Sequence, residues 1–153
     1  MKTIYLAYGS NLDMGQMATR CPKAKAVGAM LLPDWRLIFR GVADIIRAKG
    51  AFVPVGLWEI TEECEKSLDR YEGYPHLYGK QYWEKGKKTY MAYTMNRDGF
   101  AAPNPMYLAG IFQGYEDFSL DRHYLQEALA MTALYASDEG ENLGYVPKRL
   151  RTQ

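Results

Sequence analysis

The sequence has no long apolar segment and no excess of one charge. None of its apolar runs approaches the roughly 20 residues needed to cross a bilayer, and its first residues, which break at Tyr8-Gly9, are too few for the apolar core of a secretory signal. Nineteen basic and eighteen acidic residues give a net charge of +1, which provides no strong field for nucleic acid or an anionic membrane. We therefore expect a soluble protein with neither as a partner.

Cysteine and histidine are scarce, with two of each. Neither His76 nor His123 stands in a metal-ligand spacing with Cys21 or Cys64, so we expect no metal site. Without a secretory signal, the two cysteines are expected to be reduced thiols in a cytoplasmic protein. No second glycine is followed by Lys and Ser or Thr as in a phosphate-binding loop, and the Gly-x-Ser-x-Gly elbow is missing. Nucleotide binding and serine hydrolysis are therefore disfavoured.

The composition is that of a folded domain. Apolar residues make up 48% of the 153 residues and charged residues 24%, close to globular averages. We expect one domain over residues 1–140, followed by a polar C-terminal arm over 141–153. Thirteen tyrosines are an unusual number, and because tyrosine combines apolar area with a hydroxyl, they suggest a wet pocket as much as a core.

Periodicity and turn residues predict the secondary structure of an α+β domain. A short helix is capped by Asn11 or Asp13 and ends before Pro22. Leu32-Pro33-Asp34 is a turn signal between two strands, and residues 41–50 are expected to form a hairpin or loop. The remaining elements are strands at 3–7, 24–31, 35–40, 54–60, 81–83 and 88–95, and helices from Thr61 to Gly73, 106–112 and 121–135.

The first candidate for chemistry is the turn Tyr8-Gly9-Ser10-Asn11-Leu12, which follows the first strand. Glycine allows a close approach of the backbone, and the amides at a helix start suit a carboxylate or an oxyanion. Gly-Ser-Asn is also ordinary turn chemistry, so on composition alone a structural role remains open.

The second candidate is Glu72, in the last turn of the predicted helix before Gly73. The negative end of the helix dipole opposes a carboxylate charge there, and Tyr71 and Tyr74 reduce its hydration, so we expect a raised pKa that suits general acid/base catalysis. A solvated surface glutamate is the alternative. Nearby Glu65 and Asp69 are interpreted as helix-surface charges.

The order of several motifs is more specific than any one of them. Ala7-Tyr8-Gly9-Ser10-Asn11-Leu12 is followed by Val55-Gly56-Leu57-Trp58-Glu59-Ile60 and then by Leu68-Asp69-Arg70-Tyr71-Glu72-Gly73. Tyr78-Gly79-Lys80 and Pro103-Asn104-Pro105-Met106-Tyr107-Leu108 come next. In this order they resemble the γ-glutamylcyclotransferase family over most of the chain.

This resemblance implies a compact mixed β-barrel with flanking helices, in which the glycine turn and the glutamate face one cavity. It also implies an enzyme that needs no cofactor and releases 5-oxoproline from small γ-glutamyl compounds by intramolecular aminolysis, a lyase-type reaction formerly grouped with acyl transfer. Glu72 would be the catalytic acid/base. The substrate-binding residues would be Tyr8, Gly9, Ser10, Asn11, Leu12 and Tyr107.

Two residues depart from the family pattern: Asp44 stands where many relatives have asparagine, and Lys80 replaces a commoner arginine. A carboxylate near the cavity would favour a cationic leaving group, so we expect γ-glutamyl amines to be better substrates than acidic peptides. A non-catalytic γ-glutamyl-binding or regulatory module is the alternative, and RNA contact through the basic residues 148–151 is a weaker one. The leaving group and the oligomeric state stay open.

Overall fold

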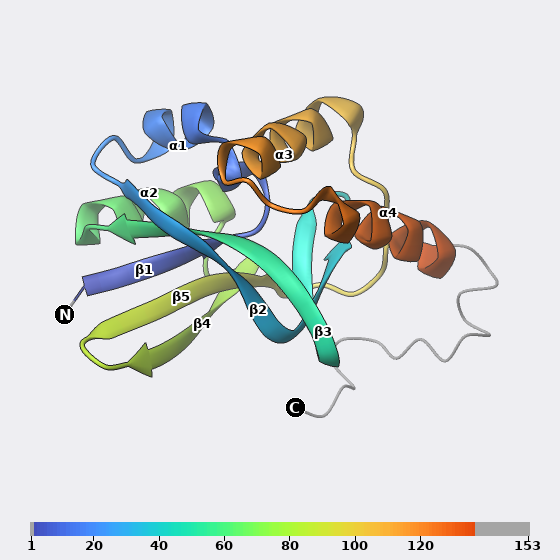
Figure 1. Cartoon of the computed structure of the whole chain (residues 1–153), viewed down its shortest axis with the longest axis horizontal. Coiled ribbons are helices and arrows are strands. Elements are labelled where there is room, and N and C mark those ends of the chain that lie inside the picture. Colours follow the sequence, from blue (N-terminus) through green and yellow to red (C-terminus); the bar gives the residue numbers. More distant parts are fainter. Residues whose placement is uncertain (1, 137–153) are drawn as a thin grey trace.

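The computed structural model describes residues 2–136, so the predicted arm (141–153) and residues 137–140 of the predicted domain lie outside the described residues. Figure 1 shows the elements in chain order. They are β1 (Lys2–Ala7), the 3-10 helix η1 (Ser10–Leu12), α1 (Met14–Arg20), β2 (Lys25–Phe39), β3 (Ala43–Ile60), α2 (Glu62–Glu72), β4 (Tyr78–Lys85), β5 (Lys88–Met95), α3 (Pro105–Asp117) and α4 (Arg122–Ala136).

The strands form one mixed sheet in the order β2-β3-β1-β5-β4. β1 lies at its centre, antiparallel to β3 and parallel to β5. β2 and β4 are the two edges, so the sheet is open, although it is strongly twisted (Figure 1). The single α+β domain with a mixed sheet and flanking helices is therefore confirmed. The word barrel describes the sheet only loosely, because the edge strands do not pair with each other.

The hairpin of β2 and β3 differs most from the prediction. Residues 24–31 and 35–40 were expected to be two strands around a turn, but β2 runs through Pro33 and Asp34 without reversing. The pairing with β3 shifts between Pro33 and Trp35, where the single residue Asp34, at φ 66°, lies opposite residues 48–51 of β3. Of the hairpin or loop expected at 41–50, the hairpin turn forms at residues 40–42, but the rest belongs to β3, which begins at Ala43.

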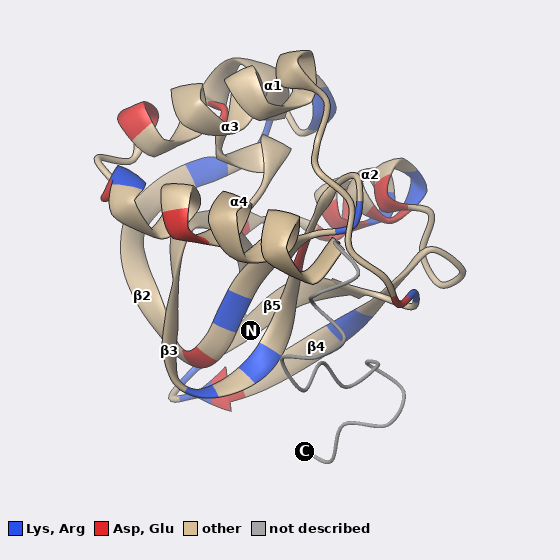
Figure 2. Cartoon of the chain, turned by 90° about the vertical axis from the view of Figure 1, so that its right-hand side faces the viewer, with Lys and Arg blue, Asp and Glu red and all other residues tan. Residues whose placement is uncertain are grey.

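Helices α1, α2 and α4 begin and end close to the predicted residues, whereas α3 continues beyond the predicted end at residue 112 to Asp117. Asp13 caps α1 by accepting hydrogen bonds from the N–H groups of Gly15 and Gln16. Thr61 caps α2 in the same way through the N–H of Cys64, and Gly73 ends α2 in the left-handed region at φ 67°. Figure 2 shows acidic and basic residues side by side on α2. No helix within residues 2–136 is long and apolar enough to span a bilayer.

Helix α3 packs closely against the short helix η1. A Cβ added at Gly114 of α3 would lie 2.2 Å from the Cβ of Leu12, so only glycine lets the two segments approach this closely. Leu12 itself is fully buried. This contact fixes the turn that follows β1 against the body of the protein.

A disulfide bond joins Cys21 and Cys64, which corrects the prediction of reduced thiols. Their Cα atoms are 5.2 Å apart because the end of α1 lies against the start of α2. The two cysteines are 43 residues apart in the sequence, so no local pattern indicates that they are in contact. The loop that the bond closes includes the whole β2-β3 hairpin.

Candidate active site

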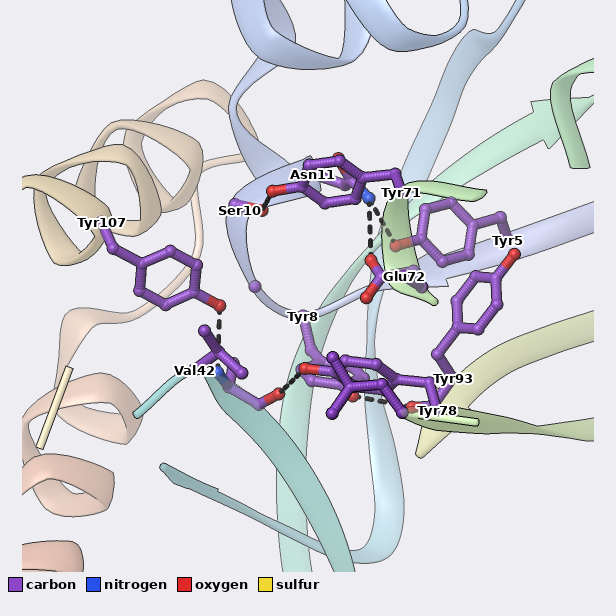
Figure 3. Close-up of a pocket in the computed structure, with 13 residues that line it drawn as sticks. Tyr5, Tyr8, Ser10, Asn11, Val42, Tyr71, Glu72, Tyr78, Tyr93 and Tyr107 are labelled. Atoms are coloured by element: carbon purple, nitrogen blue, oxygen red, sulfur yellow. Dashed lines mark hydrogen bonds between the residues drawn. The ribbon is translucent and has the colours of Figure 1, made fainter. Parts of the chain in front are cut away.

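A cavity of about 230 Å³ opens where the end of β1 meets the end of α2. The hairpin turn before β3, the strands β4 and β5, and helix α3 complete its wall (Figure 3). Six of the thirteen tyrosines of the sequence line it, as the tyrosine content suggested. The lining residues are Tyr5, Tyr8, Gly9, Ser10, Asn11, Val42, Ala43, Tyr71, Glu72, Leu77, Tyr78, Tyr93 and Tyr107.

Glu72 is the carboxylate of this cavity. It is the last residue of α2, and the left-handed Gly73 turns the chain away directly after it. Burial raises the pKa of the Glu72 carboxyl to about 7, and the nearby Arg20 guanidinium opposes this rise. The predicted direction of the pKa is confirmed, with burial as its main cause. A carboxyl with this pKa both accepts and returns protons near neutral pH.

Asn11 connects Glu72 to the turn after β1. Its Nδ2 donates to the Tyr5 hydroxyl at 2.9 Å and to Glu72 Oε1 at a longer 3.5 Å. Its backbone carbonyl accepts a hydrogen bond from Trp58 Nε1 at 2.9 Å. The two motifs that were separated by about 60 residues in the sequence thus meet in one hydrogen-bonded group (Figure 3).

The tyrosine hydroxyls are held by the backbone of neighbouring strands. Tyr8 donates to the carbonyl of Tyr93 at 2.7 Å, and Tyr78 donates to the carbonyl of Ala43 at 2.8 Å. Tyr107 instead accepts from the N–H of Ala43 at 2.9 Å. Burial raises the pKa of the Tyr107 phenol, so it stays neutral and keeps a proton to donate to a ligand.

Gly9 forms part of the floor of the cavity. A Cβ at this position would lie 3.1 Å from the Cβ of Ala43 and 3.3 Å from the Tyr107 hydroxyl. A side chain would therefore occupy the space in front of that hydroxyl. The predicted role of this glycine, a close approach of the backbone, agrees with its surroundings.

The structure brings together all but one of the predicted site residues. Tyr8, Gly9, Ser10 and Asn11 line the cavity together with the predicted Glu72 and Tyr107. Leu12 does not: its side chain lies in the core, and its N–H donates to the carbonyl of Gly9 at 3.0 Å. The structure therefore gives no support to the prediction of Leu12 as a binding residue, because η1 turns its side chain inward.

Asp44 and Lys80 also lie away from the cavity wall. Asp44 is fully buried, and its carboxylate accepts from Arg40 Nε and from the N–H of Met95, each at 2.9 Å. Because this charge is paired inside the fold, it gives no support to the predicted preference for a cationic leaving group. Lys80 forms ion pairs with Glu65 at 2.8 Å and Asp69 at 2.7 Å.

Glu65 and Asp69 are consequently not the surface charges that the sequence indicated. Asp69 also accepts a hydrogen bond from the Tyr93 hydroxyl at 2.6 Å. Burial opposes the charge of Lys80, but its hydrogen bonds to the two carboxylates outweigh this and hold the pKa of its ammonium above the usual value. The cluster joins α2 to β4 and β5 beside the cavity.

Sequence reasoning missed the other cavity residues. Tyr5 lies three residues before Tyr8 on β1, and Tyr93 is on β5, with no motif to single them out. Val42 and Ala43 are contributed by the hairpin turn that was expected to be part of a longer loop. Only the high tyrosine content pointed to this wall. Among residues 2–136, no three His, Cys, Asp or Glu side chains are arranged to hold a metal ion.

Comparisons with known proteins point to the same family as the motifs. A family model described as "Gamma-glutamyl cyclotransferase, AIG2-like" matches residues 5–110. The chain is 27% identical to a human protein named "Gamma-glutamylcyclotransferase", over 98% of this chain and 90% of the human one. A mouse protein of the same name is 28% identical, over 84% of this chain and 78% of its own. A solved structure titled "Gamma-glutamyl cyclotransferase" superposes with a TM-score of 0.73 at 25% identity, covering 94% of this chain and 98% of the other.

Proposed function

Because this chain belongs to the gamma-glutamyl cyclotransferase, AIG2-like family, we propose that it cyclises γ-glutamyl amides, releasing 5-oxoproline and an amine or amino acid, with Glu72 as its acid/base. The observation that carries the assignment to Glu72 is the position of this half-buried carboxyl, with its pKa of about 7, inside the cavity. The cavity has a volume of about 230 Å³, which is below the roughly 300–1,000 Å³ typical of sites for drug-sized ligands. A group the size of a glutamyl moiety is therefore its expected occupant.

The proposed reaction begins with proton transfer. The α-amine of a γ-glutamyl compound is protonated near neutral pH and cannot attack until it loses a proton, which the ionised Glu72 accepts. The free amine then attacks the γ-carbonyl carbon, a C–N bond forms to close the five-membered ring, and the bond to the departing nitrogen breaks. Glu72 returns the proton to that nitrogen, the ring nitrogen gives up its second proton as the ring closes, and the released amine leaves with both protons in its ammonium form. The carboxylate is thereby regenerated and no cofactor is consumed.

Positioning supplies much of the expected acceleration, because attack within one molecule depends on holding amine and carbonyl at about 3 Å. We propose that the backbone amides of Gly9, Ser10 and Asn11 bind the substrate's α-carboxylate or the developing oxyanion. The Tyr107 hydroxyl, which accepts a hydrogen bond from Ala43, is proposed to donate its own hydrogen bond to the same ligand. Support comes from the place of all four residues in the cavity wall.

The test is release of 5-oxoproline from a panel of γ-glutamyl amino acids, amines and peptides. Glu72→Gln should lower kcat by about 10²–10⁴-fold, the usual contribution of a general acid/base, while the fold is retained. Glu62→Gln is the matched control, because it makes the same change at an exposed position at the other end of α2.

Dependence on pH gives a second measurement. Since the base form of Glu72 is required, kcat/KM should rise about tenfold per pH unit below about pH 7 and level off above it. If the wild-type protein binds γ-glutamyl ligands yet releases no 5-oxoproline over hours, the non-catalytic alternative replaces the enzyme.

The cytoplasmic location stays a prediction, and the Cys21–Cys64 disulfide counts against it because disulfides are rare in reducing compartments.

A further inference from the structure

Arg20 does not line the cavity, yet it contacts three residues that do. It is the last residue of α1. Its Nη1 donates to Asn11 Oδ1 and, at 3.3 Å, to Ser10 Oγ. Its guanidinium lies 3.6 Å from the centre of the Tyr71 ring, a stacking contact that favours a cation. One side chain thus joins the turn after β1 to the end of α2.

The contact with Asn11 decides which way its amide points. A guanidinium has only donors, so the Asn11 oxygen must face Arg20 and its Nδ2 must face the other way. Nδ2 then donates to Tyr5 and lies 3.5 Å from Glu72 Oε1. Without Arg20, the amide is free to turn and present its oxygen to the Glu72 carboxylate, which would repel it.

Arg20 is held in place through both its side chain and its backbone. Nη2 donates to Gln16 Oε1 at 2.8 Å, one turn earlier on α1. The backbone carbonyl of Arg20 accepts from Ser67 Oγ on α2 at 2.9 Å, and the next residue forms the disulfide with Cys64 of α2. The guanidinium therefore has a fixed position relative to the helix that carries Glu72.

Arg20 is also the cation that acts on Glu72. Its charge lowers the pKa of the carboxyl against the effect of burial. The other titratable groups that line the cavity with Glu72 come from α2, from β1 and the turn after it, and from β4, β5 and α3. Tyr71 is the one on α2. Burial raises the pKa of the remaining phenols, so they are neutral near pH 7; they are Tyr5, Tyr8, Tyr78, Tyr93 and Tyr107.

We propose that Arg20 is a positioning residue for the proposed cyclisation: it orients the Asn11 amide and the Tyr71 ring around Glu72 without touching the substrate. This inference rests on the proposed function. It assigns to the end of α1 a task that no motif of the sequence indicated.

Three variants test the assignment. Arg20→Gln removes both the charge and the fork of donors, and Arg20→Lys keeps the charge but cannot make the same set of contacts. Arg70→Gln is the control, since it removes an exposed arginine of α2 two residues from Glu72. We expect kcat to fall about 100-fold for Arg20→Gln and about tenfold for Arg20→Lys, with Arg70→Gln close to wild type.

The second measurement is the pKa of Glu72, followed by ¹³C NMR of labelled glutamate. This pKa should rise by about 1 in Arg20→Gln, because an attractive charge is lost, and stay near the wild-type value in Arg20→Lys and Arg70→Gln. A purely structural role of Arg20 would not produce this pattern. Near-UV circular dichroism checks the fold, and Arg20→Lys carries the test if Arg20→Gln does not fold. Wild-type kcat in both Arg20 variants, or an equal change in Arg70→Gln, would overturn the inference.

A failure of the proposed function would give a different set of results from a failure of the inference about Arg20. Wild-type protein would then release no 5-oxoproline from any member of the panel, while the NMR titration would still report on Arg20. A Glu72 pKa that rises in Arg20→Gln alone would uphold the contact network in that case. An unchanged pKa would reject it whatever the activity.

Discussion

Replacing Glu72 with glutamine should stabilise the protein above pH 7, even though it removes the proposed acid/base group. The cavity buries a carboxyl whose charged form is poorly solvated, which is why its pKa rises from 4.5 to about 7. Glutamine has nearly the same shape and no charge to desolvate. Stability and activity should therefore change in opposite directions at this position.

The magnitude follows from the pKa of Glu72 in the two states. The folded state binds the proton more tightly than the unfolded state, so wild-type stability falls as pH rises from 4.5 to 7 and stays low above pH 7. Each pKa unit corresponds to 1.36 kcal/mol, which gives a cost of about 3 kcal/mol. Glu72→Gln should match the wild type near pH 4.5 and exceed it by about 3 kcal/mol at pH 8, or roughly 6–12 °C in Tm.

Urea denaturation at pH 5, 6, 7 and 8 measures this difference. Glu62→Gln serves as the control, and any pH dependence common to both variants belongs to the net charge rather than to the cavity. A Glu72→Gln advantage that does not grow between pH 5 and pH 8 would refute the reasoning. It would mean that the carboxyl is better solvated, or better paired, than its position in the cavity implies.

Three further perturbations address other contacts. A methyl group at Gly9 would lie 3.3 Å from the Tyr107 hydroxyl, so Gly9→Ala should raise KM for a γ-glutamyl substrate about tenfold in steady-state kinetics; an unchanged KM would contradict its place in the site. Gly114→Ala would put its Cβ 2.2 Å from that of Leu12 and should cost about 1–3 kcal/mol in thermal denaturation, with an unaltered Tm as the opposing result. Reducing the disulfide, which spans 43 residues, should lower the free energy of unfolding by up to about 4 kcal/mol; equal urea curves with and without dithiothreitol would show that it adds no stability.

Local rules were sufficient for helices α1, α2 and α4 and for strands β1 and β5. Thr61 and Gly73 specify the two ends of α2 through a side-chain cap and a left-handed residue, and both are readable from sequence. The β2-β3 hairpin could not be predicted from such local rules. Pro33 and Asp34 are ordinary turn residues, and only pairing with β3 across a bulge makes the strand continue through them.

The candidate site shows the same division. Glu72 and the turn from Tyr8 to Asn11 stood out as motifs, and the family resemblance placed them in one cavity. The partners of charged residues depended on distant contacts: Asp44 is paired by Arg40, and Lys80 joins two carboxylates of α2. No local pattern distinguishes such a paired charge from a solvated one.

The register of β4 determines which carboxylates of α2 are paired with an ammonium group. Glu65, Asp69 and Glu72 follow one another at helical spacing on α2, while Tyr78 and Lys80 are alternate residues of β4 and share a face. Lys80 forms ion pairs with the first two, whereas Tyr78 shares the cavity with Glu72. A slip of two residues in β4 would bring the ammonium beside Glu72 and hold it ionised. The alignment of one edge strand thus determines which carboxylates of α2 lie beside an ammonium group and which one lies beside a phenol.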